Sequence, residues 1–491
     1  MSSPASPVSP PIADPAPPAS PGEIDLSCRW PVGLLLFCAS GWLLFGGVVG
    51  ALAAIKLHAP GLLAHWPMFT YGRIQPVAWN AFVLGFGLQA GLGIALWIMA
   101  RLSGATLVGT GSIILGTLTW NAGLKLGLLS VLMAGGTGME TLELPRFAVI
   151  ILFVGYALIA AWPLVVFQRR RRGDVYPSEW FFVAALFSFP WLYLAGNCLA
   201  VWYPLRGVLQ AAAQAWFTHG LFIGWFGFLT IGVALYLLPK ISGVALPSRN
   251  LAGFGFWLLA VFGFWGGAQR YFAGPLPAYL TAQGVVATVL TVFPMIAIGL
   301  LVWPVVQTSR KAIFSVPAGR FAVAGLGCFL AWGGLAAINC LSPVRAITQF
   351  TLATVALDHL LLWGAFGLTA IGACYYIAPQ VIGRELPFAG WISWHFRLAT
   401  AAVLLHVVAF GVGGLIQGAG LENPDKAFIE VMRGWIPFAG MGTLAMTLQA
   451  VGGLLLFANV VAAVVAQARA AVVPVAQEWL TPSAPKAEVR P

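Results

Sequence analysis

Long apolar blocks separated by short polar segments follow one another along most of the chain. From Trp30 onward there are twelve such blocks, each about long enough to cross roughly 30 Å of hydrocarbon as a helix. The predicted spans are 31–55, 77–101, 106–134, 146–167, 180–202, 208–238, 251–272, 276–306, 320–340, 348–379, 390–416 and 436–467. This pattern predicts an all-α polytopic membrane protein with twelve transmembrane helices.

The two ends of the chain differ from this pattern. Residues 1–25 are rich in Pro, Ala and Ser and contain no apolar block. They predict a disordered tail, because a signal peptide needs an apolar segment behind a basic start. We therefore expect a membrane domain over 26–470 and a cytoplasmic C-terminal tail over 471–491.

Composition supports the membrane assignment and limits the other classes. Of the 491 residues, 60% are hydrophobic and 8% are charged, whereas soluble domains carry roughly 25% charged residues. The net charge of +11 comes mostly from basic residues in short loops, where such residues set the topology of a membrane protein. We therefore expect the chain to lie in a lipid bilayer and not to bind nucleic acid. The six cysteines are scattered without a CxxC pair, so they predict no disulfide framework, zinc site or covalent haem attachment.

The distribution of Lys and Arg predicts the orientation. With the N-terminus inside, sixteen basic residues fall on inner segments and eight on outer loops. This asymmetry predicts that both termini are cytoplasmic.

Acidic residues gather on two of the outer loops. They are Glu140 and Glu143 on one loop, and Glu422, Asp425 and Glu430 on another. Such patches can steer a basic partner by long-range attraction, or they can be ordinary solvated loop surface. No internal sequence repeat and no nucleotide-binding or nucleophile-elbow motif is evident.

Ionisable side chains inside the spans are the candidate functional residues. Asp358 and His359 lie in span 348–379, and His219 lies in span 208–238. Such groups are costly in hydrocarbon unless they face protein, water or a metal, and imidazole is a common ligand of transition metals and haem iron. Each histidine can equally be a neutral, hydrogen-bonded core residue.

Three further residues have a more structural interpretation. His406, in span 390–416, has no acidic neighbour and resembles a core histidine. His395 lies at the inner border of the same span and is expected to anchor it. Lys125 is expected to snorkel towards the interface, with a proton path as the alternative.

Several phrases, in their order along the chain, resemble subunit I of the haem-copper oxidases, and are most similar to the cbb-type cytochrome c oxidases. The resemblance covers nearly the whole chain after the tail, and its phrases are TYGRIQPVAWNAFVLGF (70–86), YPSEWFFVAALFSFPWLYLAGN (176–197), TIGVALYLLPKISG (230–243), WGGAQRY (265–271), GACYYIAP (372–379), ISWHFRLAT (392–400), GLIQG (414–418) and QAVGG (449–453). It implies a haem-copper oxidase subunit I-like bundle in a bacterial inner-membrane respiratory complex, with partner subunits that include c-type cytochromes at the outer face.

The resemblance also implies a ligand set of six histidines for two haems and one copper. Matched residue by residue, one low-spin haem ligand falls on His359 and the first copper ligand on His219. The remaining ligand positions hold Ala78 for the low-spin haem, Leu357 for the high-spin haem, and the pair Gln269-Arg270 for copper.

Other family positions are also replaced. A redox tyrosine falls on Gly263, a carboxylate falls near Leu335, and two arginines fall on Gln75 and Gln449. We therefore expect at most one haem b, held by His359, and no copper, so that His219 alone remains of the metal ligands. The alternatives are an active terminal oxidase or nitric oxide reductase-like enzyme with unorthodox ligands, and a proton channel or transporter that uses Lys125, Asp358 and His359.

Overall fold

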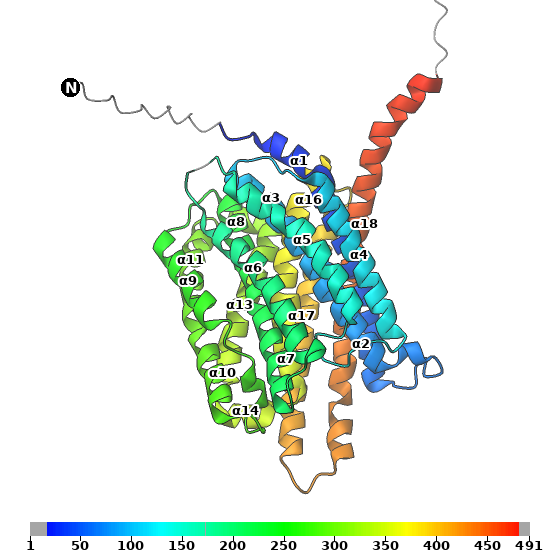
Figure 1. The fold of residues 1–491 in the computed structure, drawn as a ribbon, viewed down its shortest axis with the longest axis vertical. Coiled ribbons are helices and arrows are strands. Elements are labelled where there is room, and N and C mark those ends of the chain that lie inside the picture. The colour runs from blue at the N-terminus through cyan, green and yellow to red at the C-terminus, as the bar shows by residue number, and fades with distance from the viewer. Residues whose placement is uncertain (1–16, 172, 481–491) are drawn as a thin grey trace, which may run out of the picture.

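The computed structural model describes residues 17–171 and 173–480, and these residues form a bundle of long helices (Figure 1). The α-helices are α1 (Pro21–His58), α2 (Tyr71–Asn80), α3 (Leu88–Ser103), α4 (Thr110–Leu132), α5 (Arg146–Gln168), α6 (Pro177–Asn197), α7 (Val208–Leu221), α8 (Phe228–Ser242), α9 (Arg249–Phe262), α10 (Ala278–Leu290), α11 (Val292–Thr308), α12 (Arg310–Ser315), α13 (Pro317–Ile338), α14 (Ser342–Thr348), α15 (Leu352–His359), α16 (Leu368–Ile382), α17 (Ala389–Leu421) and α18 (Phe428–Leu480). Shorter helical segments are the 3₁₀ turns η1 (Pro67–Phe69) and η5 (Ala268–Tyr271) and the π-helical segments η2 (Ala81–Gly87), η3 (Cys198–Trp202), η4 (Phe222–Gly227) and η6 (Leu360–Gly367).

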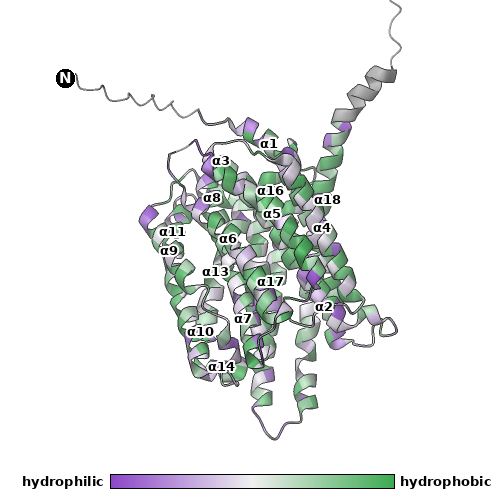
Figure 2. Ribbon diagram, viewed as in Figure 1, coloured by the Kyte–Doolittle hydropathy of each residue, from purple (hydrophilic) through white to green (hydrophobic). Residues whose placement is uncertain are grey.

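Eleven helices within the described residues are long and apolar enough to cross a membrane. The prediction of an all-α membrane bundle is confirmed, and hydrophobic residues run along the helices while hydrophilic ones gather towards their ends (Figure 2). The predicted span 251–272 is wrong as a single helix: α9 is 14 residues long, or about 21 Å. After Phe262 the chain leaves the helix and turns through Gly267, whose φ of +117° favours glycine, into η5.

The helix boundaries at both ends also differ from the prediction. α1 begins at Pro21, inside the segment predicted as a tail, because Ser20 caps it: the Glu23 amide donates to Ser20 Oγ (3.3 Å) and the Ser20 amide donates to Glu23 Oε2 (2.8 Å). Residues 1–16 of that predicted tail lie outside the described residues. α18 continues to Leu480, past the predicted limit of the membrane domain at residue 470. The start of α1 and the end of α18 lie at the same end of the bundle (Figure 1).

Three spans occupy the centre of the bundle and share one construction. They are Tyr71–Ser103, Val208–Ser242 and Leu352–Ile382, and their most apolar stretches are entirely or almost entirely buried, whereas the other spans bury half or less. Each contains a π-helical segment near its middle and ends at a glycine in the left-handed conformation (φ 64°, 72° and 78° for Gly104, Gly243 and Gly383). The sequence shows no repeat, yet the structure repeats this element three times.

Aromatic side chains from the π-helical segments of these spans meet in the core. Phe82 of η2 stacks on Trp363 of η6 with ring centroids 3.9 Å apart, and Phe366 of η6 lies 4.8 Å from Phe226 of η4. A π-helical insertion displaces the side chains that follow it and is frequent at functional sites. Here the three insertions bring the segments next to His219 and His359 into one central layer.

Candidate functional site

His219 lies on α7, directly before η4, and is 4% exposed. Its Nε2 atom is buried and has no hydrogen-bond partner among the described residues. The backbone of this chain at Gly266 covers the atom closely: a Cβ added to Gly266 would lie 2.2 Å from it. The Nε2 edge of the imidazole therefore faces the backbone of the loop after α9, and only glycine fits there.

The same loop is held by Gln269 of η5. The Gly267 amide donates to Gln269 Oε1 (2.5 Å), and Gln269 Nε2 donates to Thr288 Oγ1 on α10 (2.9 Å). Both polar atoms of this buried amide are thus engaged in fixing the turn. A Cβ on Gly267 would lie 2.5 Å from the Ala215 carbonyl oxygen, so the loop also approaches the α7 backbone closely.

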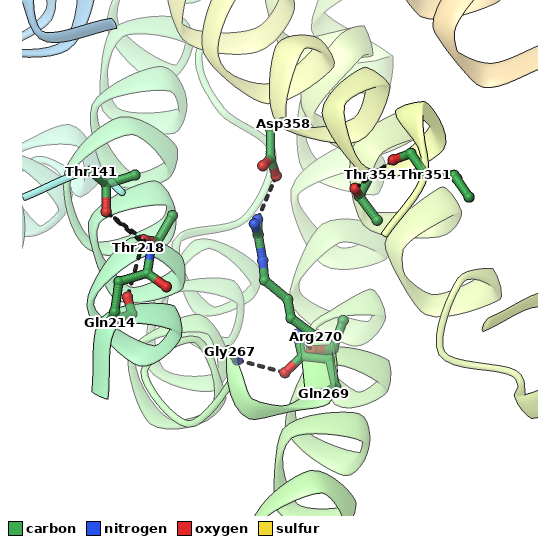
Figure 3. Close-up of polar contacts among 10 residues, drawn as sticks. Thr141, Gln214, Thr218, Gly267, Gln269, Arg270, Thr351, Thr354 and Asp358 are labelled. Atoms are coloured by element: carbon green, nitrogen blue, oxygen red, sulfur yellow. Dashed lines mark hydrogen bonds and ion pairs between the residues drawn. The ribbon is translucent and has the colours of Figure 1, made fainter. Parts of the chain in front are cut away.

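Arg270 extends from η5 to the helix that carries Asp358 (Figure 3). Its Nη2 donates to Asp358 Oδ1 at 2.5 Å, with side-chain exposures of 28% and 21%. Charge-assisted bonds of this kind are stronger than neutral ones. The two residues also line a small cavity of about 50 Å³, and His219 forms another part of its wall.

His359 follows Asp358 but lies against different neighbours. Its ring stacks on His406 of α17, with centroids 3.6 Å apart and planes 5° apart, and lies 5.8 Å from Trp363. Within the part of the chain that the structure describes, His359 Nε2 and both ring nitrogens of His406 are buried without hydrogen-bond partners. Two imidazolium charges at this separation would repel by about 5 kcal/mol at an effective dielectric constant of 20, so at most one ring carries a proton charge.

Other positions that the family resemblance matches to functional residues hold side chains without metal-ligating atoms or lie away from His219 and His359. Ala78 on α2 is 7% exposed and faces α1, since a Cβ on Gly50 would lie 3.8 Å from its Cβ. Leu335 on α13 is 42% exposed, on the outer surface of the bundle. Gln449 on α18 is buried, and its Nε2 has no hydrogen-bond partner in the described part of the chain.

The sequence profile of the family described as Cytochrome C and Quinol oxidase polypeptide I matches residues 31–448. The chain belongs to this family. Its helices thus form the polypeptide I fold, and the predicted resemblance to subunit I of the haem-copper oxidases is confirmed.

Two bacterial cytochrome c oxidase subunits are similar to this chain at low sequence identity over most of its length. Cytochrome c oxidase subunit 1 of Rhodobacter capsulatus is 26% identical over 462 residues, covering 88% of this chain and 84% of that protein. The cbb3-type cytochrome c oxidase subunit CcoN1 of Stutzerimonas stutzeri is 25% identical over 435 residues, covering 82% and 90%. In shape, the chain matches a solved heme-copper terminal oxidase dimer with a TM-score of 0.70 at 16% identity, over 88% of this chain and 83% of that one.

Two further contacts around the candidate site were not predicted from the sequence. The first is the contact of His406 with His359, which come from different helices; His406 is buried, as a core histidine would be, but it lies directly on the candidate haem ligand. The second involves the loop between α4 and α5. Here Glu143 is 7% exposed, its Oε2 accepts from Asn80 Nδ2 (2.8 Å), and its Oε1 accepts from the Thr141 amide (2.9 Å).

This loop corrects the interpretation of its acidic residues as a surface patch. Glu143 is turned into the protein and cannot steer a partner. Its neighbour Thr141 shares a hydrogen bond with Thr218 Oγ1 (2.8 Å), and both threonine hydroxyls accept from Gln214 Nε2 (Figure 3). The loop thereby connects α2, next to Ala78, with the helix that carries His219.

Lys125 and His395 lie away from these groups. Lys125 on α4 is exposed and lines a groove of about 510 Å³ on the outside of the bundle, beside Asn121 and Trp42. His395 is buried, and its Nδ1 bonds to the Tyr375 hydroxyl (2.9 Å), in agreement with an anchoring role for its span. Neither residue contacts the Arg270–Asp358 pair.

Proposed function

We propose that this chain is a divergent, subunit I-like protein of a respiratory membrane complex, altered at the high-spin haem and copper positions and holding at most one haem b at His359. In the proposed orientation both termini are cytoplasmic, in a bacterial inner membrane. The observation that carries the proposal is the Arg270–Asp358 ion pair beside His219.

The donor set around His219 does not fit a copper ion. A copper site of imidazoles needs several ligands that converge, and the two neighbouring matched positions hold Gln269 and Arg270. The Gln269 amide is already bonded on both sides, and a guanidinium has no lone pair to offer a cation. The Nε2 atom of His219 itself faces Gly266.

The haem positions differ from one another. Leu357, at the matched high-spin position, has an alkyl side chain that cannot bond iron. His359 has a buried, unpartnered Nε2, which fits one axial ligand of a haem, but Ala78 offers no second one. A bound haem would supply electron-transfer chemistry, and this chain would contribute a single imidazole to it.

The two alternative functions have less support. An active oxidase with unorthodox ligands would need Gln269, His406 or a ligand from a partner chain to fill the vacant ligand positions. Gln269 is engaged in its loop, and His406 stacks on His359. A proton channel through Lys125 and Asp358 would need the two residues on one path, but Lys125 lies on the outer surface of α4.

Cofactor analysis of the purified protein tests the proposal. We expect no copper by atomic absorption and at most one haem b per chain by pyridine haemochrome. A reduced-minus-oxidised spectrum that shows a single b-type band, lost in His359→Ala and kept in His58→Ala, would assign the ligand. Two haems with stoichiometric copper, or oxygen consumption in membranes without other oxidases, would contradict the proposal.

A further inference from the structure

The cavity beside the ion pair has a second arginine in its wall. Arg345 comes from α14, a short helix after α13, and lines the same space of about 50 Å³ as Arg270 and Asp358. The cavity thus joins three charged side chains from three separate elements.

The charges in this wall do not balance. Arg270 is paired with Asp358 at 2.5 Å, and Arg345 lies within electrostatic range of the same carboxylate, which is the one carboxylate among the residues that line the cavity. Glu140, the other carboxylate within electrostatic range of Arg270, is exposed and does not line it. Two guanidiniums against one carboxylate give the cavity an excess of one positive charge.

Arg345 is also short of hydrogen-bond acceptors. This residue is 4% exposed, and its Nε–H group is buried with no hydrogen-bond partner in residues 17–171 and 173–480. An uncompensated buried charge is strongly unfavourable, and proteins supply it with a counter-charge and acceptors. Asn339 lines the same cavity, and its Oδ1 already accepts from Thr348 Oγ1 (2.5 Å), so its NH₂ group is the one left to donate.

We propose that this cavity is a binding site for one small monovalent anion of the size of chloride or nitrate, held by the Arg345 guanidinium. A single negative charge balances the wall, and its lone pairs accept hydrogen bonds from the Arg345 guanidinium. A space of about 50 Å³ accommodates a few water molecules or one such ion. The inference rests on the proposed function, because a copper ion at His219 would occupy the same region.

Anion titration of the full chain in an uncharged detergent tests the site. The protein is prepared in gluconate, and chloride or nitrate then replaces gluconate at constant ionic strength while the thermal midpoint and the fluorescence are followed; Trp332 lines the cavity as a reporter. We expect a saturable rise of the midpoint with either small anion. Arg345→Met should weaken this binding at least about tenfold, since it removes one partner of a buried charge contact.

The matched control is Arg206→Met, which removes an exposed arginine of an outer loop and should leave the response unchanged. A saturable response that survives Arg345→Met would overturn the site, and so would a response that is only linear in anion concentration. If Arg345→Met does not fold, Asp358→Asn decides: it raises the positive charge of the wall and should tighten anion binding, whereas unchanged or weaker binding would overturn the site.

The two proposals fail in different ways. Copper and haem are measured on the same preparation. A copper-free protein without saturable anion binding would remove the anion site and leave the proposed function standing. Stoichiometric copper would remove the proposed function, whatever the anion titration gives.

Discussion

Arg270 and Asp358 lie 88 positions apart in the sequence and form one ion pair at the edge of the central spans. Arg270 also lies over the Phe222 ring, 5.9 Å from its centroid. Each charge lowers the free-energy cost of burying the other, because an unpaired charge at this depth in the bundle is unfavourable.

Breaking this pair from one side should cost more than replacing it. Asp358→Leu leaves Arg270 without its partner and should lower the free energy of unfolding by about 2–3 kcal/mol, the usual size of a lost bond to a charged group. The double variant Arg270→Met with Asp358→Leu should recover most of that loss, because an apolar pair of similar volume replaces a buried pair well. Thermal unfolding of the two single variants and the double variant measures this; a double variant as unstable as the worse single one would contradict it.

Gly266 sets the contact with His219. We expect Gly266→Ala to lower the free energy of unfolding by about 1–3 kcal/mol, because the new methyl group would overlap the imidazole. Gly327→Ala on α13 is the control: nothing lies within 4 Å of its added Cβ, so the change should be neutral or stabilising by up to about 1 kcal/mol. Equal effects of the two variants in thermal unfolding would argue against a tight loop over His219.

At the scale of elements, the loop between α4 and α5 packs inward because Glu143 meets a complete set of donors. Burial raises the pKa of Glu143 to about 7, although the hydrogen bonds from Asn80 and Thr141 act in the opposite direction. The carboxyl group is thus held in a place that disfavours its charged form.

This loop predicts a pH dependence of stability. The pKa of Glu143 in the folded protein lies above its ordinary value of 4.5, so between these two values the folded state binds more protons than the unfolded state. Stability is therefore highest below about pH 4.5 and falls as the pH rises to about 7, by about 3 kcal/mol in total for this group. Unfolding free energies measured from pH 4.5 to 7.5 should show this fall in the wild type and a smaller one in Glu143→Gln; identical slopes would show that Glu143 is not the cause.

At the scale of the whole molecule, exposed acidic residues gather at the end of the bundle where α17 leads into α18. The loop between α17 and α18 carries Glu422 and Asp425, and Glu430 lies in the first turn of α18; all three are exposed. They remain the acidic surface predicted from the sequence, whereas the patch at residues 140–143 loses Glu143 to the interior.

We expect this acidic surface to attract a basic c-type cytochrome. Replacing Glu422, Asp425 and Glu430 by their amides should slow association at low salt by roughly tenfold or more and remove most of its salt dependence. The control is Glu385→Gln, an exposed carboxylate at the opposite end of α17, and stopped-flow association rates provide the measurement. An association rate unaffected by the triple change would show that a partner docks elsewhere.

The sequence by itself determined the membrane class, eleven of the twelve predicted spans as long helices in place, and the presence of buried histidines at 219 and 359, because hydrophobic length and composition are local properties. It mispredicted 251–272, since apolar composition does not reveal where a glycine-rich turn ends a helix. It also missed the π-helical segments of the three central spans.

Only the tertiary structure decided which polar groups meet. The stack of His359 on His406, the pairing of Arg270 with Asp358 and the placement of Arg345 in the same cavity each join residues of different helices. Nothing in the local sequence specifies such partners, because they depend on how the helices rotate and pack against one another. The physical reason is the cost of isolated polar groups in the bilayer: the chain must satisfy them internally, and the fold determines with which residue.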